Sequence, residues 1–306
     1  QSIEKALSLI PGYIELLLEE IDYTSTIVNK LNLNLETVYI GGGTPTSLTE
    51  GQLRSVIERI NLRFDMKRCR EFTVEAGRPD TITEEKLRTL KQLGVNRISI
   101  NPQTLNDNVL KIIGREHTSN QTIEAFNMAR KCGFDNINMD LIAGLPTEEY
   151  TSFINTIDEI CDLSPENITV HTLSLKRSSR LNQEGNGECV SRPEAIQKMV
   201  YYAADKLRKE GYKPYYLYRQ SKMISNLENI GFTKSGYENL YNIYMMEEIH
   251  TILSCGASGV TKLKDPYGDT IERIFNFKFP YEYMGRFPEI IRKKDKVLIF
   301  YDKFLR

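Results

Sequence analysis

The chain has 306 residues, with 40 Lys or Arg against 41 Asp or Glu, so its formal charge is −1. This length suits one large α/β domain with an appendage or two ordinary domains, and the near-neutral charge gives no reason to expect nucleic acid or an anionic membrane as a partner. No apolar run approaches the ~18 residues that a membrane-spanning helix needs, and no signal peptide opens the sequence.

The first 175 residues alternate short apolar strands with amphipathic helices. Strands are predicted at Thr37–Ile40, Glu71–Glu75, Asn96–Ile100, Asn136–Ile142 and Asn167–Leu173. Helices are predicted over the first thirty residues and at Thr49–Ile60, Thr83–Leu93, Gln121–Cys132 and Tyr150–Cys161. This order predicts consecutive right-handed βαβ units and a parallel sheet.

The sheet is predicted to curl into a partial (β/α) barrel rather than to stay open. The dinucleotide-binding pattern GxGxxG does not follow the first strand, and GGGTPT lacks the Lys and the Ser/Thr of a P-loop. Glycine, polar and charged residues instead lie at or just past the carboxyl ends of the predicted strands. This is the end of the strands at which α/β barrels bind ligands. These residues are Gly41–Thr46, Glu75, Gln103, Asp140 and His171.

After residue 175 the pattern changes to a predicted α+β cap. A polar loop precedes the amphipathic helix Glu194–Gly211 and the tyrosine-rich strand Tyr212–Tyr218. Residues 219–241 are predicted to be loop-rich, Glu247–Cys255 to be helical, and SCGASGVTKL to be a turn and a strand. We therefore expect two domains, a core over 1–175 and a C-terminal region over 176–306 that completes the barrel and covers a substrate site.

Four strand-end features could carry chemistry, and each has a plainer interpretation. The glycines Gly41–Gly43 suit either a tight turn or a ligand that approaches the backbone. Glu75 could accept from an amine or a ribose hydroxyl, or be a solvated acid. Asp140 needs a partner in its apolar strand, either a ligand or a salt bridge to a helix. His171 is the only group on these strands that titrates near neutrality, and it could equally be a core histidine.

Cysteines and histidines offer no metal motif. The five cysteines are scattered, odd in number and contain no CxxC pair, so we expect a reducing, cytoplasmic setting without a disulfide framework. The three histidines share no ligand spacing, which makes a zinc site improbable. Since no Ser-His-Asp order, nucleophile elbow or HExxH occurs either, a bound cofactor is expected to carry the difficult step.

Four motifs, in this order and spacing, closely resemble radical S-adenosylmethionine enzymes of haem biosynthesis, the oxygen-independent coproporphyrinogen III oxidases. They are YIGGGTPTSL, VEAGRPDTIT, NRISINPQTLNDNVLKIIGREHT and NMDLIAGLPTE. The segments VHTLSLKRSSRL and YYLYRQSKM…NLENIGF resemble the Clostridium- and Bacillus-type branch, and the resemblance covers most of residues 11–265.

The resemblance implies a (β/α)6-type partial barrel that holds a [4Fe–4S] cluster and S-adenosylmethionine. In such enzymes a 5′-deoxyadenosyl radical takes hydrogen from a propionate side chain, and loss of CO2 leaves a vinyl group, giving protoporphyrinogen IX. The implied partners are the porphyrinogen substrate and an electron donor such as flavodoxin or ferredoxin.

The resemblance also assigns binding residues. Contacts to the methionine end of the cofactor fall on Gly42, Gly43 and Thr44. Further cofactor contacts fall on Glu75, Gln103, Arg115 and Asp140, and less securely on His171 or Thr172 and on Val260 in CGASGV. From charge alone, the candidates for pairing substrate carboxylates are Arg177, Arg180 and Arg219, with a solvated surface as the plainer interpretation. No catalytic residue is assigned.

Two departures from the family pattern leave alternatives open. The cluster motif CxxxCxxC is absent, and because the chain opens with Gln1 we expect it to lie outside the given sequence; the chain as given should hold no cluster in the usual site and be inactive. The family's Glu-x-Asn-Pro becomes EAGRP at Glu75–Pro79. The alternatives are a haem chaperone, another radical enzyme sharing GGGTPT, or a cluster-free haem- or porphyrin-binding protein.

Overall fold

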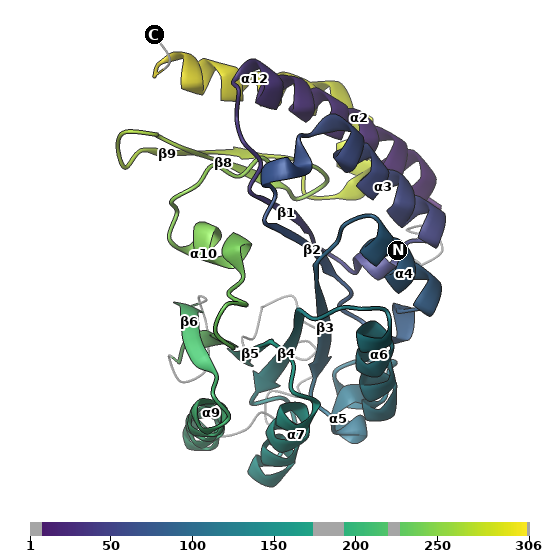
Figure 1. The fold of residues 1–306 in the computed structure, drawn as a ribbon, viewed down its shortest axis with the longest axis vertical. Coiled ribbons are helices and arrows are strands. Elements are labelled where there is room, and N and C mark those ends of the chain that lie inside the picture. Colours follow the sequence, from purple (N-terminus) through teal and green to yellow (C-terminus); the bar gives the residue numbers. More distant parts are fainter. Residues whose placement is uncertain (1–7, 174–192, 220–226, 305–306) are drawn as a thin grey trace. The chain divides into compact units, whose positions relative to one another are not determined.

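The computed structural model describes residues 8–173, 193–219 and 227–304, drawn in Figure 1. The chain divides into two compact units. The terminal unit comprises residues 1–37, 51–70 and 247–306, and the sheet unit comprises residues 38–50 and 71–246. The boundary predicted at residue 175 remains a prediction, and each unit is described by itself.

A curled, seven-stranded half-barrel sheet organises the sheet unit, which confirms the predicted partial barrel (Figure 1). Its strands are β1 (Thr37–Ile40), β2 (Glu71–Glu75), β3 (Arg97–Gln103), β4 (Ile137–Ala143), β5 (Asn167–Thr172), β6 (Lys213–Tyr218) and β7 (Asn229–Thr233). Their spatial order is β1-β2-β3-β4-β5-β7-β6.

The central pairs of strands are parallel and the last two pairs are antiparallel. Strands β2, β3, β4 and β5 pair in parallel, as the βαβ pattern predicts. Strand β7 then pairs antiparallel with both β5 and β6. This strand was missed in the region predicted to be loop-rich, because it is only five residues long and contains Gly231. Since β7 reverses the direction, β6 runs the same way as β5.

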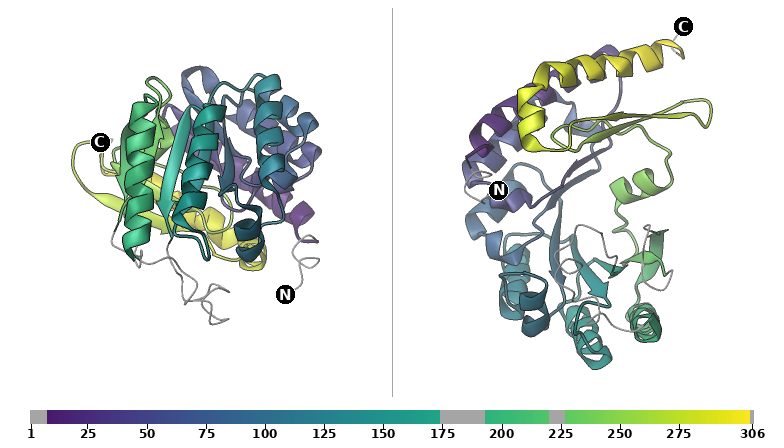
Figure 2. Two further views of the ribbon diagram at one scale, coloured as in Figure 1. Left: turned by 90° about the horizontal axis from the view of Figure 1, so that it is seen from below. Right: turned by 180° about the vertical axis from the view of Figure 1, so that it is seen from behind.

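The helices of the sheet unit cover one face of the sheet (Figure 2). They are α4 (Glu84–Gln92), α5 (Asp107–Ile112), α6 (Ser119–Lys131), α7 (Tyr150–Leu163) and α9 (Pro193–Lys209). Helix α10 (Leu240–Met246) is not part of this layer, and its Tyr241 stacks on Tyr39 of β1. Every second strand residue is apolar and fully buried, as with Val74, Ile98, Met139 and Ile168. The intervening residues point to the opposite face, which is therefore free to be polar.

Local signals in the sequence set the helix ends. The Thr83 hydroxyl accepts from the Lys86 N–H at the start of α4. At the start of α6, Thr118 and Gln121 form a capping box, each side chain accepting from the other's backbone N–H. Gly94 and Gly133 follow the ends of α4 and α6 with φ of +92° and +88°, the left-handed conformation that glycine adopts without strain.

The terminal unit packs helices against a two-stranded hairpin. It contains α2 (Ile10–Lys30), most of α3 (Glu50–Arg63), β8 (Val260–Lys264), β9 (Ile271–Phe275), α11 (Pro280–Gly285) and α12 (Phe287–Asp302). The helix predicted at Glu247–Cys255 was wrong. Glu248 has φ of +52°, and its carboxylate binds Lys262 and Arg273 of the hairpin at 3.0 and 2.5 Å. These ion pairs fix a turn where local propensity favours a helix.

A buried carboxylate holds the terminal unit together. Glu20 of α2 is fully buried and accepts from the Gly256 N–H at 2.7 Å and from the Tyr283 hydroxyl at 2.7 Å. Its charge is balanced by Lys294 of α12, whose Nζ lies 3.1 Å from Glu20 Oε1 and also donates to the Ser254 carbonyl at 2.7 Å. One ion pair thus joins the first long helix, the turn before β8 and the last helix.

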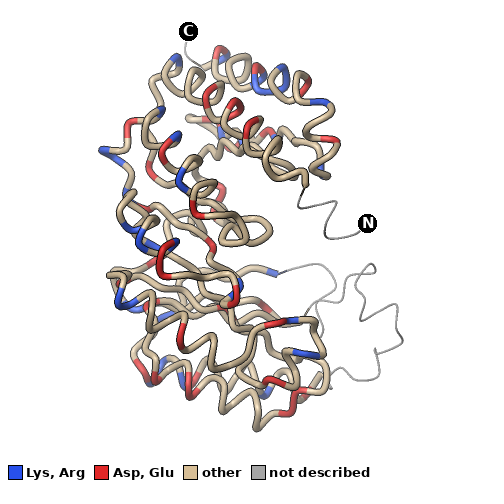
Figure 3. The backbone as a smooth tube through the Cα atoms, turned by 90° about the vertical axis from the view of Figure 1, so that its right-hand side faces the viewer, with Lys and Arg blue, Asp and Glu red and all other residues tan. Residues whose placement is uncertain are grey.

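Charges elsewhere are dispersed. Acidic and basic residues are interspersed along the described chain in Figure 3, in keeping with the net charge of −1. Among the described helices, none combines the length and apolarity needed to cross a bilayer.

Replacing Lys294 with Met should cost ~3–5 kcal/mol of unfolding free energy, because it leaves the Glu20 carboxylate buried without a cation. The matched control is Lys303→Met at the end of the same helix, where the ion pair with Glu272 is about half exposed. That control should stay within ~0.5 kcal/mol of wild type in urea denaturation. Equal losses in the two variants would contradict the assigned role of Glu20.

Candidate functional site

The face of the sheet away from the helices is lined by polar side chains at every second position of neighbouring strands. These residues are Glu75 of β2, Ser99 and Asn101 of β3, Asn138 and Asp140 of β4, Thr169 and His171 of β5, and Tyr216 and Tyr218 of β6. They form one connected layer. Asn138 donates to Ser99 at 3.1 Å and accepts from Thr169 at 3.2 Å, and Thr169 lies 3.3 Å from the Tyr216 hydroxyl.

The triple glycine follows β1 and is exposed, as expected for a ligand-facing turn. At Gly41 a Cβ would lie 2.5 Å from the Tyr39 ring and 2.8 Å from Glu75 Oε1, so packing excludes any side chain there. Gly42 has φ of +108°, which favours glycine. A Cβ at Gly42 or Gly43 would meet nothing within 4 Å, so there is open space beside both Cα atoms, while the Gly42 N–H bonds to Glu75.

Glu75 closes β2 and is held against that turn. The Tyr39 hydroxyl donates to Glu75 Oε1 at 2.5 Å, and the Tyr39 ring stacks on Tyr241 at 4.2 Å. Burial raises the pKa of Glu75, and the charge of Asp140 adds to the increase, although the bonds from Tyr39 and the Gly42 N–H work against it. Glu75 and Asp140 therefore lie close enough to influence each other.

Asp140 of β4 is the anionic group of the layer. Its carboxylate accepts from Asn138 Nδ2 at 2.7 Å and lies 3.8 Å from His171 Nε2. Burial alone raises its pKa, but His171, Asn138 and Thr169 outweigh that effect and hold the pKa of Asp140 below its ordinary value. The other ring nitrogen of His171 is 3.2 Å from the Tyr218 hydroxyl.

Two further predicted contacts are Gln103, at the end of β3, and Arg115, in the loop between α5 and α6. Gln103 is buried and has φ of +68°, a conformation that is rare for residues other than glycine. Arg115 is half-buried. Burial lowers its pKa, while the charges of Asp80 and Asp140 raise it. The Arg115 guanidinium therefore lies within electrostatic reach of Asp140.

The remaining predicted residues divide among several places. Thr44 begins the turn Pro45–Ser47 behind the glycines, and Thr172 ends β5. Arg219 directly follows β6 and pairs with Glu228 at 3.3 Å. Val260 belongs to the terminal unit, at the start of β8. Arg177 and Arg180 lie outside the described residues.

Sequence reasoning missed Tyr39, Asn138, Thr169, Tyr216 and Tyr218. The available signal was the two-residue polar alternation within strands such as NITVHT, which was used to predict strands but not to read their inner face. A second signal was Gly231 of β7, where a Cβ would lie 1.9 Å from the Tyr216 ring. The glycine allows that ring to lie across the strand.

The layer suits S-adenosylmethionine, which carries an amine, a carboxylate and ribose hydroxyls. Asp140 offers an anion, and the Gly42–Gly43 backbone is open. Thr172 Oγ1 is buried without a hydrogen-bond partner, but strand alternation places Thr172 with Ile168 and Val170 on the helix-covered face, outside this layer. An iron–sulfur cluster does not fit in the same way. Among the described residues, no group of three Cys, His, Asp or Glu could hold a metal.

A family model described as the Radical SAM superfamily matches residues 8–160, half of the chain. The chain belongs to the radical SAM superfamily. Members of this superfamily use S-adenosylmethionine and a [4Fe–4S] cluster, the two cofactors that the sequence motifs imply.

Relatives and a solved structure agree with this assignment. The chain is 44% identical to the oxygen-independent coproporphyrinogen-III oxidase-like protein HemZ of Bacillus subtilis, over 87% of this chain and 54% of HemZ. It is 32% identical to the haem chaperone HemW of Bacillus subtilis, over 86% of this chain and 68% of HemW. Coproporphyrinogen III oxidase (HemN) of Escherichia coli has the same fold, with a TM-score of 0.71 at 20% identity over 91% of this chain and 62% of HemN. The chain thus spans about half the length of HemZ.

The loop after β4 contributes a buried acid, Glu148, beside β3. Thr104, the residue after Gln103, donates to Glu148 Oε1 at 2.5 Å. Burial raises the pKa of Glu148 from 4.5 to about 7, although bonds from Thr104 and Ser152 favour the ionised form. Between these two values the folded chain keeps a proton that the unfolded chain has lost, so the unfolding free energy should fall as pH rises through this window.

Glu148→Gln cannot ionise and should therefore gain stability relative to wild type between about pH 5 and about pH 8, by at most ~3 kcal/mol. Urea denaturation across this range measures the gain. Glu149→Gln, at the neighbouring exposed position, is the control and should keep a constant difference from wild type. If the unfolding free energies of Glu148→Gln and wild type differ by the same amount at every pH in this range, Glu148 is ionised in the folded protein throughout the range.

Proposed function

We propose that this protein is a radical S-adenosylmethionine oxidoreductase of porphyrin biosynthesis, which converts propionates of coproporphyrinogen III to vinyl groups and so yields protoporphyrinogen IX. The observation that carries the proposal is 44% identity to an oxygen-independent coproporphyrinogen-III oxidase-like protein over 87% of the chain. The polar layer supports it, because it offers complementary groups for a zwitterionic cofactor.

In this proposal each strand end binds a different part of the cofactor. The Gly43 amide and the carbonyls of Gly42 and Gly43 receive the methionine carboxylate and amine, which need a backbone without Cβ atoms in the way, while the Gly42 N–H stays bonded to Glu75. Asp140, kept ionised by its neighbours, accepts from a cofactor donor, and Gln103 binds from the end of β3 and Arg115 from the loop between α5 and α6. Bound S-adenosylmethionine supplies the oxidising chemistry.

Substrate carboxylates would be paired by arginines. Of the three candidates, Arg219 is in the described part of the chain, and its side chain is 59% exposed in the pair with Glu228. An exposed pair of this kind contributes little stability, so Arg219 can exchange Glu228 for a substrate carboxylate at small cost. Arg177 and Arg180 remain proposals from charge.

The proposal also includes a flavodoxin- or ferredoxin-type electron donor in a cytoplasmic setting. Because the described residues offer no cluster ligands, no step is assigned to the cluster.

A second candidate function is haem binding and delivery. The observation that favours it is 32% identity to the haem chaperone HemW of Bacillus subtilis, of which the chain covers 68%. Both relatives match over nearly the same share of this chain, so the two functions have to be separated by experiment.

The test uses the full natural protein with its iron–sulfur cluster reconstituted anaerobically, supplied with a reductant, S-adenosylmethionine and coproporphyrinogen III. Formation of protoporphyrinogen IX together with 5′-deoxyadenosine supports the oxidase. Cleavage of S-adenosylmethionine without decarboxylation would overturn it. Haem titration of the same sample tests the second candidate, because stoichiometric, transferable haem is the expected property of a chaperone.

Asp140→Asn should weaken S-adenosylmethionine binding by ~10-fold or more, because it removes a charged hydrogen-bond acceptor while keeping the side chain's size. Isothermal titration calorimetry on the same reconstituted protein measures the dissociation constant. Asp158→Asn on α7, at a partly exposed acid bonded to Tyr202, is the control and should leave binding unchanged. An unaltered constant for Asp140→Asn would remove Asp140 from the site.

A further inference from the structure

Strand β3 contains a β-bulge just before Gln103. In the pairing with β4, Ile100 lies opposite Met139, and the next pair is Gln103 with Leu141. Three residues of β3 thus span the same length as two of β4, so one extra residue interrupts the ladder. Bulges of this kind redirect a side chain, and here the redirected residue is Gln103, whose φ is +68°.

The sequence around the bulge limits the number of unpaired backbone groups. Pro102 has no N–H and so leaves no donor without a partner where the ladder is interrupted. Its carbonyl is bound from outside the sheet, because His117 Nε2 lies 3.4 Å from Pro102 O. The His117 side chain is fully buried. A histidine fifteen residues further along the chain therefore supports the peptide next to Gln103.

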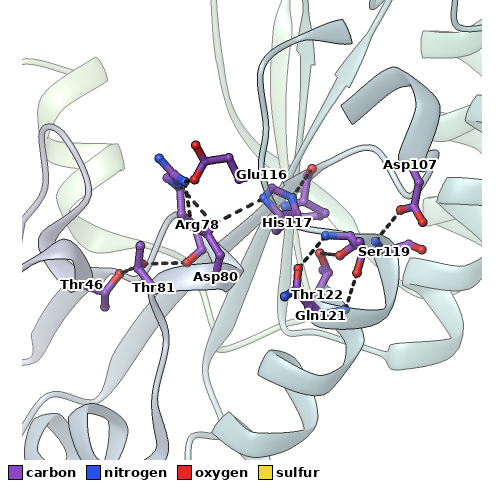
Figure 4. A network of polar contacts seen from close by, with 12 residues as sticks. Thr46, Arg78, Asp80, Thr81, Asp107, Glu116, His117, Ser119, Gln121 and Thr122 are labelled. Atoms are coloured by element: carbon purple, nitrogen blue, oxygen red, sulfur yellow. Dashed lines mark hydrogen bonds and ion pairs between the residues drawn. The ribbon is translucent and has the colours of Figure 1, made fainter. Parts of the chain in front are cut away.

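A cluster of ion pairs made by Arg78 lies beside His117, whose Nδ1 is buried without a hydrogen-bond partner (Figure 4). His117 Nδ1 lies 3.8 Å from Asp80 Oδ1. Arg78 donates to Asp80 at 2.7 Å and to Glu116 at 3.0 Å, so the loop after β2 binds the residue on one side of His117. On the other side is the capping box of α6 that begins at Thr118. The altered motif EAGRP thereby acquires a physical role, since its Arg78 joins two loops.

The same cluster bears on Arg115. The backbone N–H of Arg115 donates to the Leu110 carbonyl of α5 at 2.9 Å. This bond fixes the backbone position of Arg115 relative to the end of α5. Glu116 follows directly and is tied to Arg78. Two predicted cofactor contacts, Gln103 and Arg115, therefore depend on one support, although they are twelve residues apart in the sequence.

We propose that His117 is a positioning residue of the cofactor site. Its imidazole holds the Pro102 carbonyl, and so sets the direction of Gln103, while the Arg78–Glu116 pair keeps Arg115 beside it. The inference rests on the proposed function, because it takes Gln103 and Arg115 to be cofactor contacts. It adds a residue that contacts no cofactor atom and acts through the backbone of β3.

The experiment measures S-adenosylmethionine dissociation constants by calorimetry on the full natural protein with its cluster reconstituted. His117→Leu keeps apolar bulk but loses the ring N–H, and should weaken binding ~10-fold, whereas His117→Gln, which retains an N–H donor, should stay within ~3-fold of wild type. In a Gln103→Ala/Arg115→Met background, His117→Leu should add less than ~2-fold, because the groups it positions are gone. A merely structural role predicts the full loss in both backgrounds.

A milder variant guards against misfolding. Glu116→Gln breaks the pair with Arg78 at a side chain that is 80% exposed, so it should fold normally and weaken binding by ~2–3-fold. Its control is Glu84→Gln, which breaks an exposed pair with Arg88 on α4 and should have no effect.

The outcomes separate the two proposals. If Gln103→Ala and Arg115→Met leave binding unchanged, the proposed cofactor site is wrong and the positioning role falls with it. If those variants weaken binding but His117→Leu does not, or if His117→Leu adds its full effect in their background, the cofactor site stands and the positioning role of His117 is overturned.

Discussion

The inner face of the half-barrel sheet is polar, and every polar side chain that leaves bulk water there must find a partner. Several of these side chains find partners sideways, across neighbouring strands. Ser99, Asn138 and Thr169 bond across three neighbouring strands, and the Tyr216 hydroxyl lies beside Thr169. These residues therefore form one hydrogen-bonded unit. The pKa of Asp140 depends on its partners in that unit, because His171, Asn138 and Thr169 hold it below its ordinary value.

At two strand ends the backbone itself departs from regular geometry. After β1, Gly42 has φ of +108° with open space where its Cβ would lie, and in β3 a bulge places Gln103 in a left-handed conformation. Such conformations cost free energy and persist only where surrounding contacts hold them. The contacts are present in both cases. Tyr39 and Glu75 pack against Gly41, and His117 binds the carbonyl before Gln103. The departures lie at the edge of the sheet where the predicted cofactor contacts meet.

Much of the fold could be predicted from the sequence, because helix and strand periodicity are local properties. The five strands from β1 to β5, their helices and the strand-end position of Glu75 follow from such patterns, whereas the strand-end position expected for Asp140 was wrong, because Asp140 lies in the middle of β4. Strand β7 and the true turn at Glu248 could not be predicted, because each depends on partners far along the chain. The same reason explains why Asn138 and His117 were not singled out. Their roles arise from residues on neighbouring strands and loops, and no local motif names those partners.

The proposed cofactor contacts do not distinguish an oxidase from a haem chaperone, because relatives of both descriptions match over most of this chain. The difference has to lie with the groups that would meet a tetrapyrrole carrying several carboxylates. On β6 the neighbouring phenols are kept neutral, since burial raises the pKa of Tyr215 to about 12 and that of Tyr216 still higher. Neutral hydroxyls do not repel carboxylates, whereas Asp140 does. Under the proposed function, a substrate with negative side chains would therefore place them toward Arg219 at the end of β6 and away from β4, which leaves the Asp140 side of the layer to the proposed cofactor.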